Sequence, residues 1–369
     1  MNKILTSEVT DRITTVDELL DIYKISLDDW QIVKKVVNTW ETTIKGPDKK
    51  PKTIPNFQVK VWLESKKEII KLSKFRDELM EDLKKNSPVV PKRRYNKKSK
   101  DSGKLLEVNL FDLHLGKVAW SEETGQNYNM EIACELFLDA IDFFIEKAKD
   151  ENIERILFPI GNDFFNSDSA HPYSKTTKGT PQEDDTRWQK IYKTGRELLV
   201  SSIQKLSEVA PVDVLVIPGN HDTERAFYVG DSLECWFHND KNVTIDNSPS
   251  PRKYYKFGEV LIGLTHGNEE KITDLPGIMS QEASDWWGST YYREFHLGHL
   301  HRTSSRAFLP TTEVQGTVVR HMSSLSATDA WHHKKGYVGA RKSGEALVWD
   351  AELGLCSNYY FTAKLSNYR

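Results

Sequence analysis

Hydrophobic and polar positions follow two different periods along the chain. From residue 105 onward, short apolar runs alternate with longer segments of helical periodicity near 130–149 and 187–208. The short runs are LLEVNLF (105–111), RILFPI (155–160), DVLVI (213–217), VLIGLT (260–265) and EFHLG (294–298). This alternation is typical of strands and helices in an α/β domain. The pattern predicts such a domain over residues 105–369, with ligands bound where the strands end.

Residues 1–63 predict a small helix–hairpin domain. VDELLDIYK (16–24) has helical periodicity, and ISLDDWQIVKKVV (25–37) predicts a second helix with Ser26 and Asp29 at capping-box spacing. The alternating runs NTWETTIK (38–45) and NFQVKVWL (56–63) predict a hairpin around GPDKKPKTIP. The order is compatible with a winged helix-turn-helix, with a recognition helix carrying Lys34 and Lys35 and a wing carrying Lys49, Lys50 and Lys52. The alternative is a small cap with solvated lysines.

Residues 64–104 predict an amphipathic helix over 64–85, followed by a basic, proline-containing linker over 86–104. Residues 1–105 hold 24 Lys and Arg against 16 Asp and Glu, a net charge of +8, whereas the rest of the chain carries −11. Such a basic segment either contacts a phosphate backbone or is a solvated tether.

Composition narrows the class of protein. The chain of 369 residues is 38% hydrophobic and 28% charged, as in ordinary globular proteins. Its apolar runs are far shorter than the ~20 residues of a membrane span, and its first residues lack the apolar segment of a secretory signal. Cys134, Cys235 and Cys356 lie far apart with no CxxC pair. We therefore expect a cytoplasmic protein with reduced cysteines.

Polar motifs follow five of the predicted strands. They are Asp112-Leu113-His114, Gly161-Asn162-Asp163, Gly219-Asn220-His221-Asp222, His266-Gly267 and Gly298-His299-Leu300-His301. Strand side chains alternate with period two, so His299 and His301 point to the same side. Two such histidines can be a polar core pair or half of a metal site, and the repetition at five strand ends favours the metal site.

The motifs DLH, GND, GNHD, THG and GHLH, in this order, resemble the five signatures of the calcineurin-like metallophosphoesterases over residues 105–350. Within that superfamily the chain is most similar to the SbcD-like DNA-repair nucleases. The resemblance implies a four-layer αββα fold, a two-sheet sandwich flanked by helices. It also implies that one metal is held by Asp112, His114 and His301, and the other by Asn220, His266 and His299, with Asp163 as the bridge.

The resemblance implies that His221 faces the substrate as a general acid or transition-state stabiliser. Asp222, the other candidate catalytic residue, could orient His221 or cap the following helix. The chain departs from the family where Asn162 is inserted before Asp163, and where Asn166 replaces the His or Asp common in SbcD-like nucleases.

Mixed His, Asp and Asn ligands suit Mn²⁺, with Fe, Zn²⁺ or Mg²⁺ as alternatives. Two such ions would clamp phosphate oxygens and supply a metal-bound hydroxide as the attacking group near neutral pH. The long polar loop over 164–188 adds candidate substrate contacts at Asn166, His171, Lys175 and Lys178, although a merely solvated loop is the alternative. We expect His296 to be a packing residue, and His332 and His333 to lie at the surface.

The expected function is metal-dependent hydrolysis of phosphodiesters by a nuclease, with an exonuclease as the expected type, acting on DNA or RNA. A small- or cyclic-nucleotide phosphodiesterase is the main enzymatic alternative. A protein or small-molecule phosphatase is less favoured, because GNHD stands where protein phosphatases have GNHE. A DNA-binding or scaffold protein with a vestigial metal site is the non-enzymatic alternative. The sequence leaves open whether the protein needs an ATPase partner and whether it forms a homodimer.

Overall fold

The computed structural model describes residues 2–7, 12–45, 50–66, 95, 103–168, 174–300, 311–336 and 338–368. The chain divides into two compact units, Met1–Pro88 and Val89–Arg369, and each is described by itself. Residues 67–85 of the predicted amphipathic helix and most of the basic linker lie outside the described residues, and the predicted helix start is wrong, because residues 64 and 65 end a strand.

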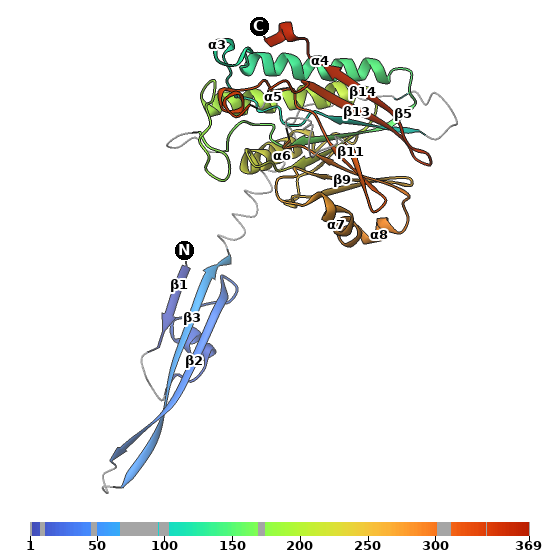
Figure 1. Ribbon diagram of the computed structural model, residues 1–369. Coiled ribbons are helices and arrows are strands. Elements are labelled where there is room, and N and C mark those ends of the chain that lie inside the picture. Colours follow the sequence, from blue (N-terminus) through green and yellow to red (C-terminus); the bar gives the residue numbers. More distant parts are fainter. Residues whose placement is uncertain are drawn as a thin grey trace. The chain divides into compact units, whose positions relative to one another are not determined.

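The described part of the first unit consists of a three-stranded antiparallel sheet and helix α1 (Figure 1). Strand β3 (Pro51–Ser65) is central, between β1 (Asn2–Thr6) and β2 (Trp30–Lys45). Helix α1 (Val16–Ile22) begins with a capping box formed by Thr15 and Glu18. Its buried Leu19 and Leu20 pack in one cluster with alternate residues of β3. A hairpin is confirmed here, but its turn is shorter than predicted, because residues 38–45 pair with residues 51–58 and the predicted loop residues 51–55 belong to β3.

The second helix predicted over residues 25–37 is wrong. Ser26 accepts hydrogen bonds within a turn, and strand β2 begins at Trp30. Lys34 and Lys35 lie on this strand, paired with β3, so the helix-turn-helix has no recognition helix. β-Branched residues such as Ile32 and Val36 favour extended backbone, and the long pairing with β3 outweighs the helical periodicity.

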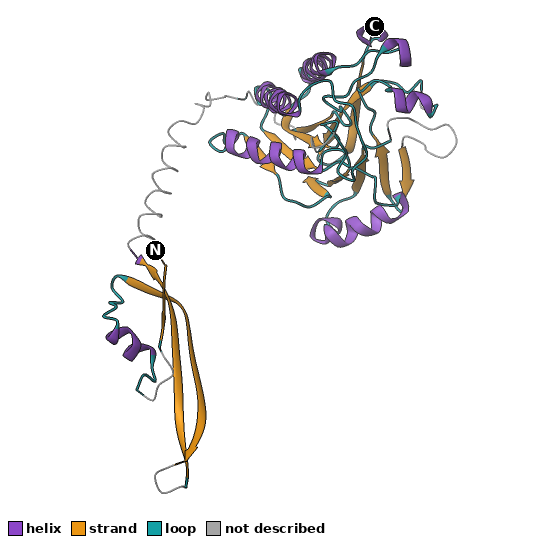
Figure 2. Cartoon of the chain, turned by 90° about the vertical axis from the view of Figure 1, so that its left-hand side faces the viewer, coloured by secondary structure: helices purple, strands orange, loops and turns teal. Residues whose placement is uncertain are grey.

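The second unit is a mixed α/β domain built on two sheets (Figures 1 and 2). The six-stranded sheet has the order β14-β13-β4-β5-β6-β7. Its strands are β4 (Lys104–Asn109), β5 (Ile153–Gly161), β6 (Val212–Ile217), β7 (Val243–Asp246), β13 (Ser343–Asp350) and β14 (Gly354–Thr362). Strands β4 to β7 are parallel neighbours, and β13 and β14 extend the sheet in antiparallel fashion.

The five-stranded sheet has the order β11-β12-β10-β9-β8. Its strands are β8 (Lys253–Phe257), β9 (Val260–Thr265), β10 (Tyr292–Leu297), β11 (Thr311–Val314) and β12 (Thr317–His321). Strands β9, β10 and β12 are parallel, so their carboxyl ends lie at one edge.

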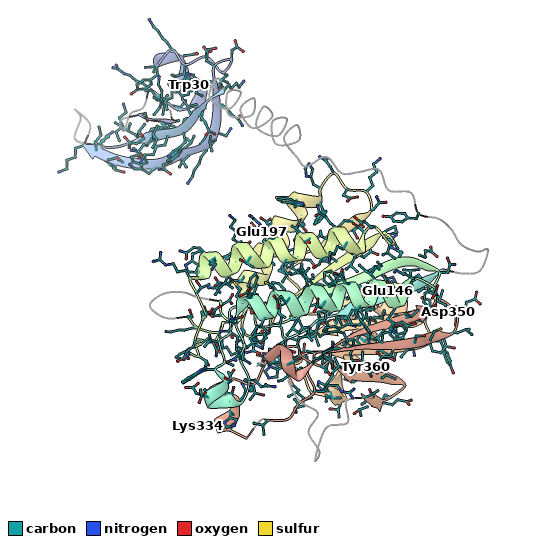
Figure 3. All side chains as sticks on the ribbon, turned by 90° about the horizontal axis from the view of Figure 1, so that it is seen from above. Trp30, Glu146, Glu197, Lys334, Asp350 and Tyr360 are labelled. Atoms are coloured by element: carbon teal, nitrogen blue, oxygen red, sulfur yellow. The ribbon has the colours of Figure 1, made fainter. Side chains whose placement is uncertain are left out.

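Helices α4 (Met130–Ala148), α5 (Trp188–Leu206) and α6 (Thr223–Phe237) pack on the six-stranded sheet, and α7 (Leu275–Glu282) packs on the five-stranded sheet. The other described helices are the short α3 (Ser121–Thr124), α8 (Ser284–Trp287) and α9 (Ala330–Lys334), with 3₁₀ turns at Ile272–Asp274 and Leu365–Tyr368. Figure 3 shows α4 and α5 side by side, with Glu146 and Glu197 on them.

Alternation along the strands creates separate cores on the two faces of the six-stranded sheet. Leu106 and Val108 of β4 pack with the helices α4 to α6, whereas Leu105 packs in a second core that includes Ile262 and Leu264 of the other sheet. A third core joins the five-stranded sheet to α7. The mixed α/β class and the strands and helices expected from residue 105 are confirmed. No helix among the described residues is long and apolar enough to cross a membrane.

Candidate metal centre

The candidate ligands follow the carboxyl ends of strands in both sheets. Asp112 lies beyond β4, Asp163 beyond β5, Asn220 beyond β6, His266 at the end of β9 and His299 beyond β10. Because β4, β5 and β6 are parallel neighbours, their carboxyl ends lie at one edge of the six-stranded sheet. The two-sheet packing brings the histidines after β9 and β10 to the same place.

Unusual backbone conformations concentrate at these strand ends. Seven non-glycine residues of the described chain have positive φ, and five of them are Asp112 (53°), His114 (50°), Asn162 (56°), Asp163 (62°) and His299 (65°). A left-handed non-glycine residue costs on the order of 1–3 kcal/mol and persists where the surrounding structure enforces it. Such a concentration is typical of a functional site.

Two glycines of the motifs allow close approach of these loops. A Cβ on Gly219 would lie 2.0 Å from Oδ1 of Asp163, and one on Gly298 would lie 2.8 Å from Oδ2 of Asp112. Any larger residue at either position would displace a candidate ligand.

Asp163 is shared by two groups of metal-binding side chains. Ligand atoms of Asp163, His266 and His299 all lie within 4.8 Å of one another, and so do those of Asp163, His114 and His221. Asn220 joins the first group, since its Oδ1 lies 2.8 Å from Nε2 of His266. The expected set Asp163, Asn220, His266 and His299 is thus brought together.

Both ring nitrogens of His266 face amide oxygens. Nδ1 lies 2.5 Å from Oδ1 of Asn162 and Nε2 lies 2.8 Å from Oδ1 of Asn220, and an amide oxygen can only accept. Burial lowers the pKa of His266, which keeps the ring neutral, so the ring can donate to only one of the two oxygens. With the proton on Nδ1, Nε2 presents a lone pair 3.1 Å from Oδ2 of Asp163.

These lone pairs fit a bound cation. Within the described chain, Oδ2 of Asp163 is buried and accepts no hydrogen bond. In the tautomer with the proton on Nδ1, Oδ2 of Asp163, Nε2 of His266 and Oδ1 of Asn220 face one another without a proton between them, and they repel unless a positive ion binds there. The inserted Asn162 acts through His266, by orienting it.

Burial also sets the charges of the neighbouring ligands. It raises the pKa of the Asp163 carboxyl to about 7, with His221 opposing and Asp112 adding to the effect. Burial and the nearby His266 together lower the pKa of His299 to about 4. A divalent cation would favour the ionised carboxylate and the neutral imidazole, which are the forms that bind metal.

Asp112 and His114 lie beside this cluster. Oδ2 of Asp112 accepts the backbone N–H of His299 at 3.0 Å, and Oδ1 lies 3.9 Å from Nε2 of His114. The ring of His114 meets the ring of His221 edge to face, with centroids 4.6 Å apart. His301, the remaining expected ligand, lies outside the described residues.

His221 is held from both its backbone and its ring. Its N–H donates to Oδ1 of Asp163 at 2.7 Å, and its Nδ1 donates to the carbonyl of Asn166 at 2.8 Å. A carbonyl can only accept, so the proton is on Nδ1, and Nε2 is the ring atom available for proton transfer.

Asp222 has contacts that differ from both expected roles. Its carboxylate accepts backbone N–H groups of Gly219, Asp163 and Phe165 at 3.0–3.3 Å. The first turn of α6 is capped instead by Asp168, which accepts from the N–H groups of residues 224 and 225. Burial raises the pKa of Asp222 well above its usual range, with Asp163 adding to the effect. Asp222 therefore links the loop after β5 to the loop after β6 through hydrogen bonds to their backbone. Among the described residues, no hydrogen bond connects its carboxylate to the His221 ring.

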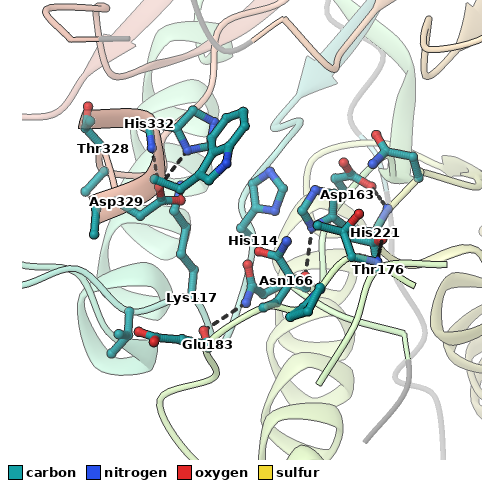
Figure 4. A pocket seen from close by; sticks show the side chains of 18 of the residues that line it. His114, Lys117, Asp163, Asn166, Thr176, Glu183, His221, Thr328, Asp329 and His332 are labelled. Atoms are coloured by element: carbon teal, nitrogen blue, oxygen red, sulfur yellow. Dashed lines mark hydrogen bonds and ion pairs between the residues drawn. The ribbon is translucent and has the colours of Figure 1, made fainter. Parts of the chain in front are cut away.

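A pocket of about 820 Å³ opens beside the cluster (Figure 4), and the ligands His114, Asp163, Asn220 and His299 line it together with His221.

The expected substrate residues differ in their positions. Asn166 lines the pocket, but its amide donates to the Glu183 carbonyl and to Asp184. Lys178 is exposed at the pocket and pairs with Glu269. Lys175 is not among the described lining residues, and His171 lies outside the described chain.

Sequence reasoning missed the far side of this pocket, which is lined by Lys117, Asp329, His332 and Lys342. His333 is exposed as expected, whereas His332 is only partly exposed and its Nδ1 lies 2.8 Å from Oδ1 of Asp329. Lys117 lies three residues after His114, a proximity that could have suggested it. The other three carry no motif. No protein-family model matches the chain, and no curated protein matches it either.

Proposed function

We propose that the chain is a dinuclear metallophosphoesterase of the calcineurin-like type that hydrolyses phosphodiesters in nucleic acid. The observation that carries the proposal is the position of Asp163, which two groups of candidate ligands share. The facing sheets between outer helices agree with the αββα arrangement that the five motifs imply.

The donor set favours a metal such as Mn²⁺. Asp163, Asn220, His266 and His299 would hold one ion, and Asp163 with Asp112 and His114 would hold the other, with His301 as a further expected ligand. Mixed nitrogen and oxygen donors suit Mn²⁺, Fe or Zn²⁺ better than Ca²⁺. When bound, two such ions would polarise the phosphoryl oxygens and activate a water molecule.

The residues around the ions have separate tasks. Asn162 would accept from Nδ1 of His266 and so leave its Nε2 for the metal. The carbonyl of Asn166 accepts from Nδ1 of His221 and so orients that ring. A protonated Nε2 of His221 would donate to the leaving oxygen. Gly219 and Gly298 keep space for Asp163 and Asp112.

The basic segment before residue 105 supports nucleic acid as the substrate, because Lys and Arg bind the phosphate backbone without sequence preference. A small-nucleotide phosphodiesterase would keep its full activity after deletion of residues 1–104. A nuclease would lose activity on long DNA or RNA, and would lose more of it at higher salt.

The testing experiment compares hydrolysis of bis-p-nitrophenyl phosphate and p-nitrophenyl phosphate with Mn²⁺. We expect preference for the diester, lost in His221→Ala and kept in His333→Ala, a control at an exposed histidine. Preference for the monoester would indicate a phosphatase. Absence of turnover with two ions bound would contradict the enzymatic proposal and favour a binding protein.

A further inference from the structure

The pocket continues from the candidate metal centre to a second group of charged side chains. Figure 4 shows Lys117, Asp329 and His332 across the pocket from His114 and His221. Lys342, which precedes β13, lines the same space. These residues come from distant parts of the chain, and none of them belongs to the five strand-end motifs.

Both lysines are almost completely buried. Lys117 is 3% exposed and Lys342 is 9% exposed. A buried ammonium group is costly unless a counter-charge or a ligand compensates it. The partners of each lysine therefore decide what this part of the pocket can bind.

The carboxylate of Asp329 compensates the positive charge of Lys117. Nζ of Lys117 lies 3.0 Å from Oδ2 of Asp329, and Oδ1 of Asp329 is occupied by the ring of His332. The ammonium of Lys342 has no hydrogen bond or ion pair to any group of the described chain. Burial and the like charge of Lys117 together lower the pKa of Lys342 to about 8, with Asp329 opposing. At neutral pH Lys342 is still mainly protonated, so its ammonium lines the pocket without a carboxylate in direct contact among the described residues.

Two tryptophans line the same pocket. Trp120 and Trp331 are each 58% exposed, although large aromatic side chains are usually buried. Exposed tryptophans beside a cationic side chain are a common arrangement for stacking nucleobases. The pocket thus combines a metal cluster, a buried cation and aromatic surface.

We infer that Lys342, supported by Lys117, binds a second phosphate group of the substrate, adjacent to the phosphodiester at the metal centre. The inference rests on the proposed function and defines its substrate class as a nucleotide strand in which a further phosphate neighbours the scissile one. Trp120 and Trp331 provide surface for its bases. A substrate with a single diester leaves the Lys342 ammonium without its anion.

The kinetic test uses the thymidine dinucleotide TpT and its terminally phosphorylated forms pTpT and TpTp, with Mn²⁺. We expect kcat/KM for one phosphorylated form to exceed that for TpT by about tenfold or more, as for a charge-assisted hydrogen bond. Lys342→Met removes the charge at similar volume, so it should abolish this preference and bring kcat/KM for the phosphorylated form to the level for TpT. Lys342→Arg, which keeps the charge, should retain at least part of the preference. Lys193→Met, at an exposed lysine of α5, is the matched control.

A binding test separates this inference from catalysis. Calorimetric titration with thymidine 3′,5′-bisphosphate in EDTA should show about tenfold weaker binding to Lys342→Met than to the wild type. The thermal midpoint of the variant should not fall, because the substitution removes an unpaired buried charge.

Equal effects of Lys342→Met on TpT and on both phosphorylated forms, with unchanged binding of the bisphosphate, would overturn the subsite and leave the proposed function intact. If the wild type hydrolyses no diester, the proposed function fails, and unchanged bisphosphate binding in the variant would then overturn the subsite as well.

Discussion

The pH dependence of stability should reveal the buried ion pairs of His296. This side chain is fully buried between the two sheets, with Nδ1 2.5 Å from Oε1 of Glu107 and Nε2 3.1 Å from Oε2 of Glu294. Both nitrogens face carboxylates, so both carry protons and the ring is an imidazolium. The other charged groups nearby are Arg320, which bonds Glu294, and Glu345. His296 is therefore not the ordinary packing residue expected from the sequence.

Burial alone would lower the pKa of His296, but the carboxylates of Glu107 and Glu294 outweigh it and raise the pKa to about 9. Between pH 6.5 and 9 the folded protein keeps a proton that the unfolded chain has released. The contribution of His296 is thus complete below pH 6.5 and is lost as the pH rises through 9. At about 1.4 kcal/mol per pH unit, the loss amounts to about 3 kcal/mol.

The assay is urea unfolding between pH 6 and 9.5 for the wild type and His296→Gln. The difference in free energy of unfolding between the two proteins should shrink by about 3 kcal/mol over this range, whereas contributions from other titrating groups cancel. His333→Gln, at an exposed histidine, should follow the wild type at every pH. Parallel pH profiles for the wild type and His296→Gln would refute the assignment of a charged, ion-paired His296.

Three further predictions concern the metal centre. Gly219→Ala places a Cβ 2.0 Å from Oδ1 of Asp163, so diester hydrolysis should fall by about 100-fold, and wild-type activity would contradict the close approach. His299→Ala should reduce bound Mn²⁺ from two ions per chain to one, as measured by elemental analysis, and retention of both ions would exclude His299 as a ligand. Asp222→Asn should lower the free energy of unfolding by about 1–3 kcal/mol, because one amide oxygen cannot accept all three backbone N–H groups, and an unchanged urea midpoint would contradict this role.

Local sequence determined the central strands and the two longest helices of the larger unit. Periodicity predicts the positions of helices α4 and α5 and of strands β4, β5, β6, β9 and β10. A helix with one buried face has apolar residues at helical spacing, and a strand buried on both faces is a short continuous apolar run. Residues 25–37 were predicted wrongly, because a mixed pattern of lysines and valines fits two periods. Only pairing with β3, which lies farther along the chain, selects the strand.

The strand-end motifs likewise predict the candidate ligands from the sequence alone. Tertiary structure alone decided the partners of these ligands and the rest of the pocket. Asn162 meets His266 across 104 positions of sequence, and Glu107 meets His296 across 189. Lys342 carries no local pattern, since an isolated lysine in a sequence is usually exposed. Periodicity records how neighbouring residues share a face, whereas the burial and pairing of a charge depend on which distant strands the fold brings together.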